Sequence, residues 1–484
     1  MKKLFLLALA FFPFACSFPV AEENVGSLPP VFPDYHGVTV PCNIAPLNFC
    51  IKDSLASDYA VVMTAGGYEW KSRSRDGVFN IPDTEWRNLL SAGDSIRVFA
   101  IGRIGGSWNS YDPYSIYVSM DKVDPYLAYR LIPPGYEIWD EIGLYQRCLE
   151  SFEQIPIIEN SSTEGNCMNC HSFASRNPDR FLFHMRGPLA GTYRIDGRDV
   201  EKLNTKTDET ISALVYPSWC ETGDYVAFSV NNISQLFHSN NRNRVEVFDT
   251  ESDVVVYDVA KHEIALSPLT CTEDRFETFP TFSPDGDWLY FCSSPACLNM
   301  PYQYKDMQYD IMRISFDRSN CSFGDELETV YSASDRGSAS FPRVSPDGSK
   351  LIFTVQPYGN FSVWHKDADL YMIDLSASSF TAVPLNGFNS GDSESYHSWS
   401  SNSRWVVFSS RRDDGLYTKP YIGHIDADGK AAKPFLLPQL NPDEYYTDLM
   451  VSFNIPEFVS GKITVPEEKI VGIARQGGTD VKVK

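Results

Sequence analysis

The sequence predicts an all-β protein in which a small β-sandwich domain precedes a ring of repeated β units. Three observations lead to this fold class. Aromatic residues make up 14% of the chain, and they favour the pleated surfaces of strands. One pattern of turn and strand recurs four times in the C-terminal two-thirds of the chain. Short strand-like runs separated by Gly and Asp turns occupy the region before these repeats.

The repeat is clearest at residues 279–291 and 341–353, and looser copies lie at 216–228 and 396–408. Ser-Pro-Asp-Gly in the clear copies predicts a tight turn, because Pro fixes φ, Asp bonds its own backbone and Gly accepts a left-handed conformation. The residues after each turn alternate into a strand, and another β run follows, so a unit holds about four strands. The second positions of the copies lie 63, 62 and 55 residues apart. Tandem units of this size are typical of β-propeller blades.

The remaining domains follow from the spacing of strand-like runs. Residues 31–130 are predicted to be a β-sandwich with strands near 38–40, 59–63, 95–101 and 114–118. Residues 131–180 are expected to be an irregular connector with one helical stretch at 139–152, and residues 181–475 to form a propeller of five or six blades. The runs at 181–184, 191–196 and 200–203 are candidates for a first, incomplete blade. Runs at 451–453 and 469–473 are candidates to complete it, which would remove exposed sheet edges.

The first residues have the pattern of an export signal. Lys2 and Lys3 precede an apolar run that is too short to span a bilayer as a helix, so residues 1–15 are predicted to be a signal peptide. Ala15-Cys16 resembles a bacterial lipobox, in which Cys16 would be lipidated. Pro13 departs from the usual Leu, which leaves cleavage by an ordinary signal peptidase open. Residues 16–30 are then a polar tether, and the expected location is the cell envelope, lipid-anchored, in the periplasm or at the outer membrane.

A CxxCH motif at residues 167–171 is the strongest functional signal. Two thiols at this spacing can form thioether bonds to a haem, and the adjacent histidine can ligate its iron. Cys167 and Cys170 are therefore candidate haem c attachment residues, and His171 is the candidate proximal ligand. Nearby aromatic residues are suitable contacts for a flat apolar macrocycle. The alternatives are a disulfide, free thiols, or a different metal.

The distal side of this haem is less well determined by the sequence. His184 and Met185 are both candidate distal ligands, but alternation on a strand lets only one of them face the haem. An open sixth position is the third alternative. Arg186 is a candidate partner for a haem propionate, because guanidinium binds carboxylate in a bidentate manner. The structural alternatives are a hydrogen-bonded blade histidine and an ordinary surface salt bridge.

The repeats also carry a family resemblance. Their FP-x-x-SPDG-x-x-L-x-F pattern resembles the TolB-type β-propeller repeat, for which six blades are usual. Residues from about 125 to 455 are further similar to a family of exported TolB-like proteins with a single CxxCH before the propeller. The segments that carry this similarity are residues 129–136, 167–173, 183–187, 358–371 and 395–401. The resemblance implies location and fold more than activity. Cys220 departs from the repeat, which often has His or Ser there.

Other candidate residues lie in the repeats themselves. His397 replaces the proline of its copy, and with Trp399 and His365 it is a candidate to line a pocket in the propeller channel. The alternative is that these side chains satisfy polar groups at blade junctions. The chain has no GxSxG elbow and no Walker or dinucleotide glycine pattern, so the sequence favours a protein that is not an enzyme.

Composition limits the partners. The net charge of −22 argues against nucleic acid and against electrostatic adsorption to anionic lipid. The sequence therefore predicts a periplasm-facing lipoprotein that binds one c-type haem for electron transfer or redox sensing, with a redox partner or other envelope proteins. The alternative is a TolB-like interaction scaffold whose CxxCH is structural or unoccupied.

Overall fold

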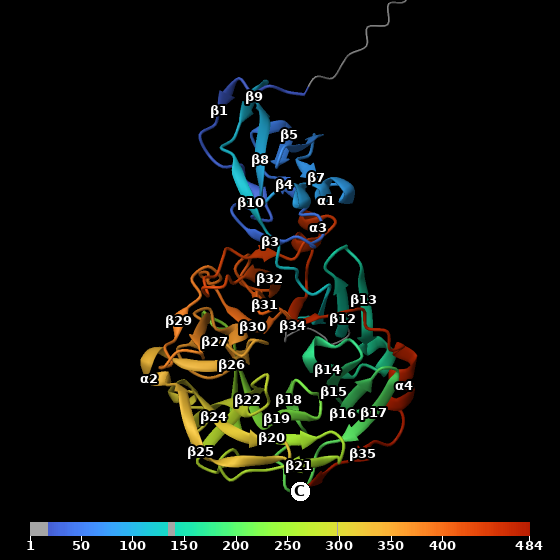
Figure 1. Cartoon of the computed structure of the whole chain (residues 1–484), viewed down its shortest axis with the longest axis vertical. Coiled ribbons are helices and arrows are strands. Elements are labelled where there is room, and N and C mark those ends of the chain that lie inside the picture. The colour runs from blue at the N-terminus through green and yellow to red at the C-terminus, as the bar shows by residue number, and fades with distance from the viewer. Residues whose placement is uncertain (1–17, 134–140, 298) are drawn as a thin grey trace, which may run out of the picture.

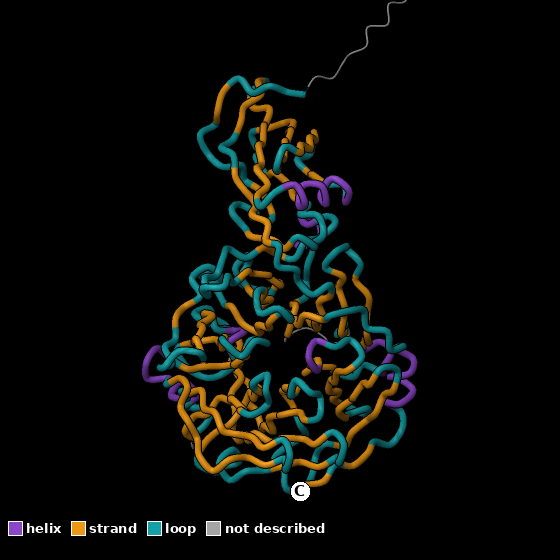
Figure 2. Tube along the Cα trace, in the orientation of Figure 1, coloured by secondary structure: helices purple, strands orange, loops and turns teal. Residues whose placement is uncertain are grey.

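The computed structural model describes residues 18–133, 141–297 and 299–484, which form two bodies built mainly of strands. Figure 1 shows a small N-terminal domain next to a larger ring of sheets. In Figure 2 the α-helices lie in the small domain, at its junction with the ring, and on the rim of the ring. They are α1 (Asp83–Ala92), α2 (Ala333–Arg336), α3 (Pro442–Thr447) and α4 (Glu467–Ala474). The predicted all-β class is confirmed, while the signal segment and Cys16 lie outside the described residues.

Two sheets and α1 make up the N-terminal domain. The larger sheet contains β1 (Glu23–Asn24), β3 (Thr39–Pro41), β5 (Ala56–Ala65), β6 (Tyr68–Ser74), β8 (Ser95–Ile104), β9 (Ser107–Ser110) and β10 (Tyr114–Ser119). The smaller contains β2 (Val31–Phe32), β4 (Phe49–Ile51) and β7 (Val78–Phe79). The four predicted strands are present. The predicted tether over residues 16–30 is partly wrong, because β1 pairs in parallel with β9 and extends the sheet.

Six further sheets of four or five strands surround a common centre in the described part of the chain (Figure 1). Within each sheet the consecutive strands pair antiparallel. The first three sheets each include a strand from the end of the chain. They are β11 (Tyr126–Ile132), β12 (Gly143–Cys148) and β13 (Gln154–Glu159) with β34 (Ser452–Val459); β14 (Cys167–Phe173), β15 (Arg180–Arg186), β16 (Gly191–Asp196) and β17 (Asp199–Asn204) with β35 (Thr479–Asp480); and β18 (Val215–Trp219), β19 (Tyr225–Phe237), β20 (Val245–Asp258) and β21 (Glu263–Ala265) with β36 (Lys482–Val483).

The last three sheets each consist of four consecutive strands. They are β22 (Arg275–Phe282), β23 (Trp288–Pro295), β24 (Asp310–Asp317) and β25 (Ser322–Tyr331); β26 (Ser338–Val344), β27 (Lys350–Gln356), β28 (Asp369–Asp374) and β29 (Val383–Pro384); and β30 (Glu394–Trp399), β31 (Trp405–Ser410), β32 (Lys419–His424) and β33 (Phe435–Leu436).

The predicted Ser-Pro-Asp-Gly turns are confirmed. Gly286 and Gly348 both have φ of +74°, a conformation that glycine adopts without a steric penalty. The amide of Gly286 donates to the carbonyl of Ser283 at 2.9 Å, and the amide of Gly348 donates to that of Ser345 at 2.8 Å. Each turn therefore joins the innermost strand of a sheet to its neighbour, as the repeat predicts.

The ring is closed by a strand from late in the chain. β34 pairs antiparallel with β11, so the sheet of β11–β13 receives its innermost strand from residues 452–459. The strands at 181–203 were expected to start an incomplete blade, but they belong to the next sheet and have β14 as their own inner strand. Residues 469–473 are helical rather than a strand, because Ile470 and Ala474 bury one face of α4 at helical spacing.

The expected irregular connector at residues 131–180 is also wrong. Apart from 134–140, which are outside the described residues, this segment supplies β12, β13 and β14. The helix expected over 139–152 is a strand at β12, which pairs with β11 on one side and β13 on the other. Pairing on both sides overrides the local preference of a short segment. The CxxCH motif consequently lies in a strand of the ring and not in a loop.

The innermost strands share one irregularity. In each, two residues interrupt the pairing register, and the first of the two has φ between 47° and 53°. The pairs are Cys170–His171, Tyr216–Pro217, Phe279–Pro280, Phe341–Pro342, Tyr396–His397 and Ile455–Pro456. A positive φ is costly for residues other than glycine, and bulges of this kind redirect side chains. The last two residues of CxxCH therefore occupy the position that aromatic–proline pairs hold in three of the other inner strands.

The redirected side chains meet near the centre of the ring. The ring centroids of Phe279 and Phe341 are 4.0 Å apart, those of Tyr216 and Phe279 are 4.7 Å apart, and those of Phe341 and Tyr396 are 4.9 Å apart. We call the six first residues of the bulges, Cys170, Tyr216, Phe279, Phe341, Tyr396 and Ile455, the central layer. Cavities lie on either side of this layer.

Candidate functional site

Cys167 and Cys170 line one cavity, which we call the thiol cavity. It borders the central layer at the amino-terminal ends of β14 and β34 and holds about 1130 Å³ of space free of protein atoms, counting the part open to solvent. Both thiol residues are more than nine-tenths buried, and burial raises the pKa of the Cys170 thiol. No disulfide joins any cysteine that the structure describes. The two thiols of the motif are thus exposed to the same cavity without being bonded to each other.

Arginines form one side of the thiol cavity. Arg186 on β15 is opposite Cys167 in the strand register, and Arg130 comes from β11. Arg130 donates to the carbonyl of Met168 at 3.2 Å, but its buried Nε has no hydrogen-bond partner. Among the described residues, no carboxylate forms an ion pair with Arg130 or Arg186. Arg130 is half-buried and Arg186 is exposed, so it is mainly Arg130 whose lack of an acidic partner favours an anionic ligand in this cavity.

The wall provided by the β19–β20 hairpin is mainly apolar. β19 and β20 have 13 and 14 residues, so they extend beyond the other strands of their sheet. Ile233 and Phe237 from β19 and Val245 and Val247 from β20 face the thiol cavity. Phe237 is 60% exposed, which is unusual for a large apolar side chain. The cavity therefore suits a ligand with an apolar body and one or more carboxylates.

His171 lies at a different cavity. Its side chain lines a smaller space together with Arg343, His397 and Glu457, and Cys170 borders both spaces. The imidazole is buried, and neither ring nitrogen has a hydrogen-bond partner. Burial and nearby Arg130 lower the pKa of His171 to about 3, so the ring is neutral. A neutral, unpartnered imidazole has the protonation state of an iron ligand, but it does not face the thiol cavity.

The two candidate distal ligands are held within the sheet of β14–β17. Nδ1 of His184 lies 3.3 Å from the hydroxyl of Thr192, and burial together with Arg186 lowers the pKa of His184 to about 4. Met185 is fully buried, pairs with Met168, and belongs to a hydrophobic core with Phe183. Neither residue lines the thiol cavity, whereas Arg186 does.

The three residues predicted to share a channel pocket are not brought together. His397 lines the small cavity with His171, and its Nε2 donates to the carbonyl of Ile352 at 3.0 Å. Trp399 lines a third cavity, and its indole donates to the carbonyl of Arg343 at 3.1 Å. Nε2 of His365 lies 2.9 Å from the Glu246 carboxylate, and both side chains are buried. The expectation of one pocket is therefore wrong for the described residues.

Sequence reasoning missed several residues of the site. Arg130 is part of the segment 129–136 that resembles TolB-like proteins, but nothing in that segment places it beside the thiols. The β19–β20 hairpin has a Ser-Asn-Asn turn signal at residues 239–241 between two strand-like runs, which was the available clue. Glu457 could be recognised as a residue of the site only from the pairing of β34 with β11, which brings together residues that are far apart in the sequence.

Within the described residues, no cluster of three or more His, Cys, Asp or Glu side chains is placed to hold a metal ion, and no helix is long and apolar enough to cross a membrane.

Comparisons with known proteins give no functional assignment. No family model and no curated protein matches the chain.

Solved structures give only distant similarity. Prolyl oligopeptidase B from Galerina marginata is 11% identical over 70% of this chain, with a TM-score of 0.36. Dipeptidyl peptidase 4 from Porphyromonas gingivalis is 10% identical over 73% of this chain, with a TM-score of 0.31. The matches span 42% and 52% of those two chains, so this chain corresponds to about half of either protein. At these scores the similarity carries no argument about activity.

Proposed function

We propose that this protein is an exported, lipid-anchored envelope protein whose central cavity holds one c-type haem through Cys167 and Cys170. The haem would serve electron transfer or redox sensing. The observation that carries the proposal is the composition of the thiol cavity: two thiols, two arginines without an acidic partner, and an apolar wall in one space. A bound haem supplies a one-electron couple whose potential depends on its axial ligands and its burial.

The fold that carries this site is proposed to be a six-bladed TolB-like propeller with an N-terminal β-sandwich. Six sheets with the same inner-strand bulge support the blade count. The seven- and three-stranded sheets of the first domain support the sandwich. In this proposal the propeller is also the docking platform for a redox partner or for other envelope proteins, and nucleic acid is not a partner.

The chemistry of the side chains fits a haem. Thiols are the attachment groups, Arg130 and Arg186 are suitable partners for two carboxylates, and Ile233 and Phe237 suit the apolar macrocycle. His171 is neutral and has free ring nitrogens, which suits iron. Its separate cavity means that ligation requires the imidazole to turn past Cys170. Because His184 and Met185 do not line the thiol cavity, we propose an open sixth position.

A second candidate function rests on the inner-strand bulge. Cys170 and His171 occupy the place of Phe341–Pro342 and the equivalent pairs, which favours a structural role for the motif. In that case the protein is a TolB-like interaction scaffold of the cell envelope. The thiol cavity would remain a binding site for an anionic ligand, but no haem would be attached.

One experiment separates the two candidates. The protein is exported in cells that have a haem-attachment system, and its visible spectrum and the mass of the peptide with Cys167 and Cys170 are measured. A Soret band that survives denaturation, lost on replacing both cysteines by Ser but kept in Cys42→Ser, is the expected result. Colourless protein with unmodified sulfurs rejects the haem and leaves the scaffold. Mass spectrometry of the mature N-terminus tests lipidation of Cys16.

A further inference from the structure

The outer half of the β19–β20 hairpin has two different faces. One face lines the thiol cavity through Ile233, Phe237, Val245 and Val247. The other face contains Glu246, which is only 3% exposed although it is a carboxylate at the free end of a hairpin. A buried carboxylate costs free energy unless its partners are well placed. The partners of Glu246 therefore determine how this wall of the cavity is held.

Glu246 is held by side chains from a distant sheet. Its Oε1 accepts from the hydroxyl of Tyr358 at 2.7 Å, and its Oε2 lies 2.9 Å from Nε2 of His365. Both partners lie between β27 and β28, whereas the hairpin belongs to the sheet of β18–β21. The ring centroids of Tyr358 and His365 are 4.8 Å apart, so the two partners also support each other.

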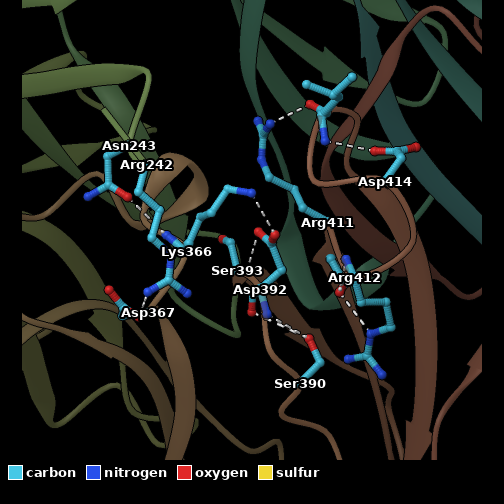
Figure 3. Close-up of polar contacts among 12 residues, drawn as sticks. Arg242, Asn243, Lys366, Asp367, Ser390, Asp392, Ser393, Arg411, Arg412 and Asp414 are labelled. Carbon is cyan, nitrogen blue, oxygen red and sulfur yellow. Dashed lines mark hydrogen bonds and ion pairs between the residues drawn. The ribbon is translucent and has the colours of Figure 1, made fainter. Parts of the chain in front are cut away.

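Polar contacts continue at the tip of the hairpin. Figure 3 shows Arg242 beside Asp367 and Asn243 beside Lys366. A nitrogen of Arg242 lies 2.6 Å from the Asp367 carboxylate, and the amide of Lys366 donates to the side-chain oxygen of Asn243 at 3.2 Å. Both charged groups of the first pair are about half exposed, so that pair adds little stability. The buried Glu246 contacts are the main polar attachment of the tip.

The base of the outer half has the features of a hinge. The register of β19 and β20 shifts between Asn232 and Ile233, where Thr250 is the extra residue. Bulges of this kind bend a ladder and weaken its pairing locally. Next to the bulge, Asp249 accepts hydrogen bonds from Asn231, Tyr309 and Asn360 at 2.6–2.9 Å, which fixes the base.

We infer that the outer half of this hairpin is a gate over the thiol cavity and that Glu246 is its latch. The inference rests on the proposed function in treating that cavity as the functional site, and it concerns access to the site. A polar latch suits a gate because its groups are rehydrated when it opens. Phe248 on the same face also packs against a hydrophobic core, with its ring centroid 6.0 Å from that of Tyr304, so opening additionally exposes apolar surface at a cost of about 25 cal/mol per Å². Opening exposes Cys167 and Cys170, and closing buries them.

The test measures access to the thiols in protein made without a haem-attachment system. A bulky maleimide is added to the mature chain, and modification of the peptide with Cys167 and Cys170 is followed by mass spectrometry. Glu246→Gln should label roughly tenfold faster than the natural chain or more, since a hydrogen bond to a buried charge is lost. Glu326→Gln, an exposed glutamate on β25, should label at the natural rate.

Labelling of Cys220 reports on unfolding, because this cysteine is fully buried at another part of the ring. If Glu246→Gln also accelerates labelling of Cys220, the test uses Tyr358→Phe instead. This variant removes only one of the two contacts of Glu246. It should give a smaller increase in labelling that is limited to Cys167 and Cys170. Equal labelling of Glu246→Gln and the natural chain, or acceleration at Cys220 in both variants, overturns the gate. Because no haem is present, this result is independent of whether haem is ever attached.

Discussion

Replacing Glu457 by Gln is expected to stabilise the protein at pH 8 and to leave its stability unchanged near pH 4. Glu457 lies on β34 and borders the small cavity with His171 and Arg343. One carboxylate oxygen accepts the amide of Phe173 at 3.1 Å. Burial raises the pKa of Glu457 to about 7, and Arg343 only partly offsets this. Gln keeps an acceptor for the amide but cannot ionise.

The sign and size of the effect follow from linkage. In the unfolded chain Glu457 ionises near its ordinary pKa of 4.5, whereas in the folded protein it keeps its proton up to about pH 7. The folded state therefore binds more protons between these values, and stability falls as the pH rises. A shift of this size corresponds to about 3 kcal/mol, lost progressively from pH 4.5 to pH 7 and absent in the Gln variant.

Thermal midpoints of both proteins between pH 4 and pH 8 measure the effect. The difference should be near zero at pH 4 and grow to a few degrees at pH 8. Glu277, whose pKa burial also raises to about 7, contributes equally to both proteins and cancels in the comparison. Glu468→Gln, an exposed glutamate on α4, is the matched control and should not alter the pH dependence. A difference that is constant with pH, or that shrinks toward pH 8, would refute the reasoning.

Three further outcomes are expected. Phe453→Ala on the closing strand removes a fully buried ring whose centroid lies 4.7 Å from that of Tyr129. In urea unfolding, this substitution should lower the free energy of unfolding by about 3–5 kcal/mol. Phe237→Ala, at an exposed residue, should change it by no more than about 0.5 kcal/mol. Gly66→Ala should lower the thermal midpoint more than Gly67→Ala. Both residues have positive φ, but only a Cβ at residue 66 would meet a backbone oxygen, at 1.7 Å. Equal effects of the two substitutions on the thermal midpoint would contradict this clash. Arg130→Ala and Arg186→Ala should each weaken the binding of protoporphyrin IX, detected by fluorescence, by roughly tenfold. Arg198→Ala, at an exposed residue outside the thiol cavity, should leave the affinity unchanged. Unchanged affinity in the first two variants would show that these arginines do not belong to the site.

The parts of the fold that are encoded locally were predictable. Gly286 and Gly348 occupy the left-handed turn positions that their repeats indicate, and the strand on either side of each turn follows from alternation. The four predicted strands of the first domain are present for the same reason. Turn chemistry and side-chain alternation act over a few residues, so a single sequence is sufficient to detect them.

The first two sheets of the ring could not be predicted from the sequence, because their local patterns differ from the repeat of the later sheets. The inner strand of the second sheet has Cys170–His171 where three other inner strands have an aromatic residue and proline, so the repeat could not be detected there. The first sheet obtains β34 from residues more than 290 positions after its other strands, a pairing that local pattern cannot indicate. Placement of the candidate site depends on both sheets. The thiols could be identified from the motif, whereas Arg130, Glu246 and the separate cavity of His171 required the three-dimensional arrangement.

The late origin of β34 fixes an order of events during biogenesis. The sheet of β11–β13 leaves the ribosome with one edge unoccupied, and that edge stays unpaired until nearly all later sheets have been made. During this interval the neighbouring β14 has no completed ring around it, so an enzyme can reach both sulfurs. Once β34 docks, both sulfurs are more than nine-tenths covered. Covalent modification of this motif therefore has free access to both sulfurs before the closing strand docks, and afterwards it requires the β19–β20 hairpin to open.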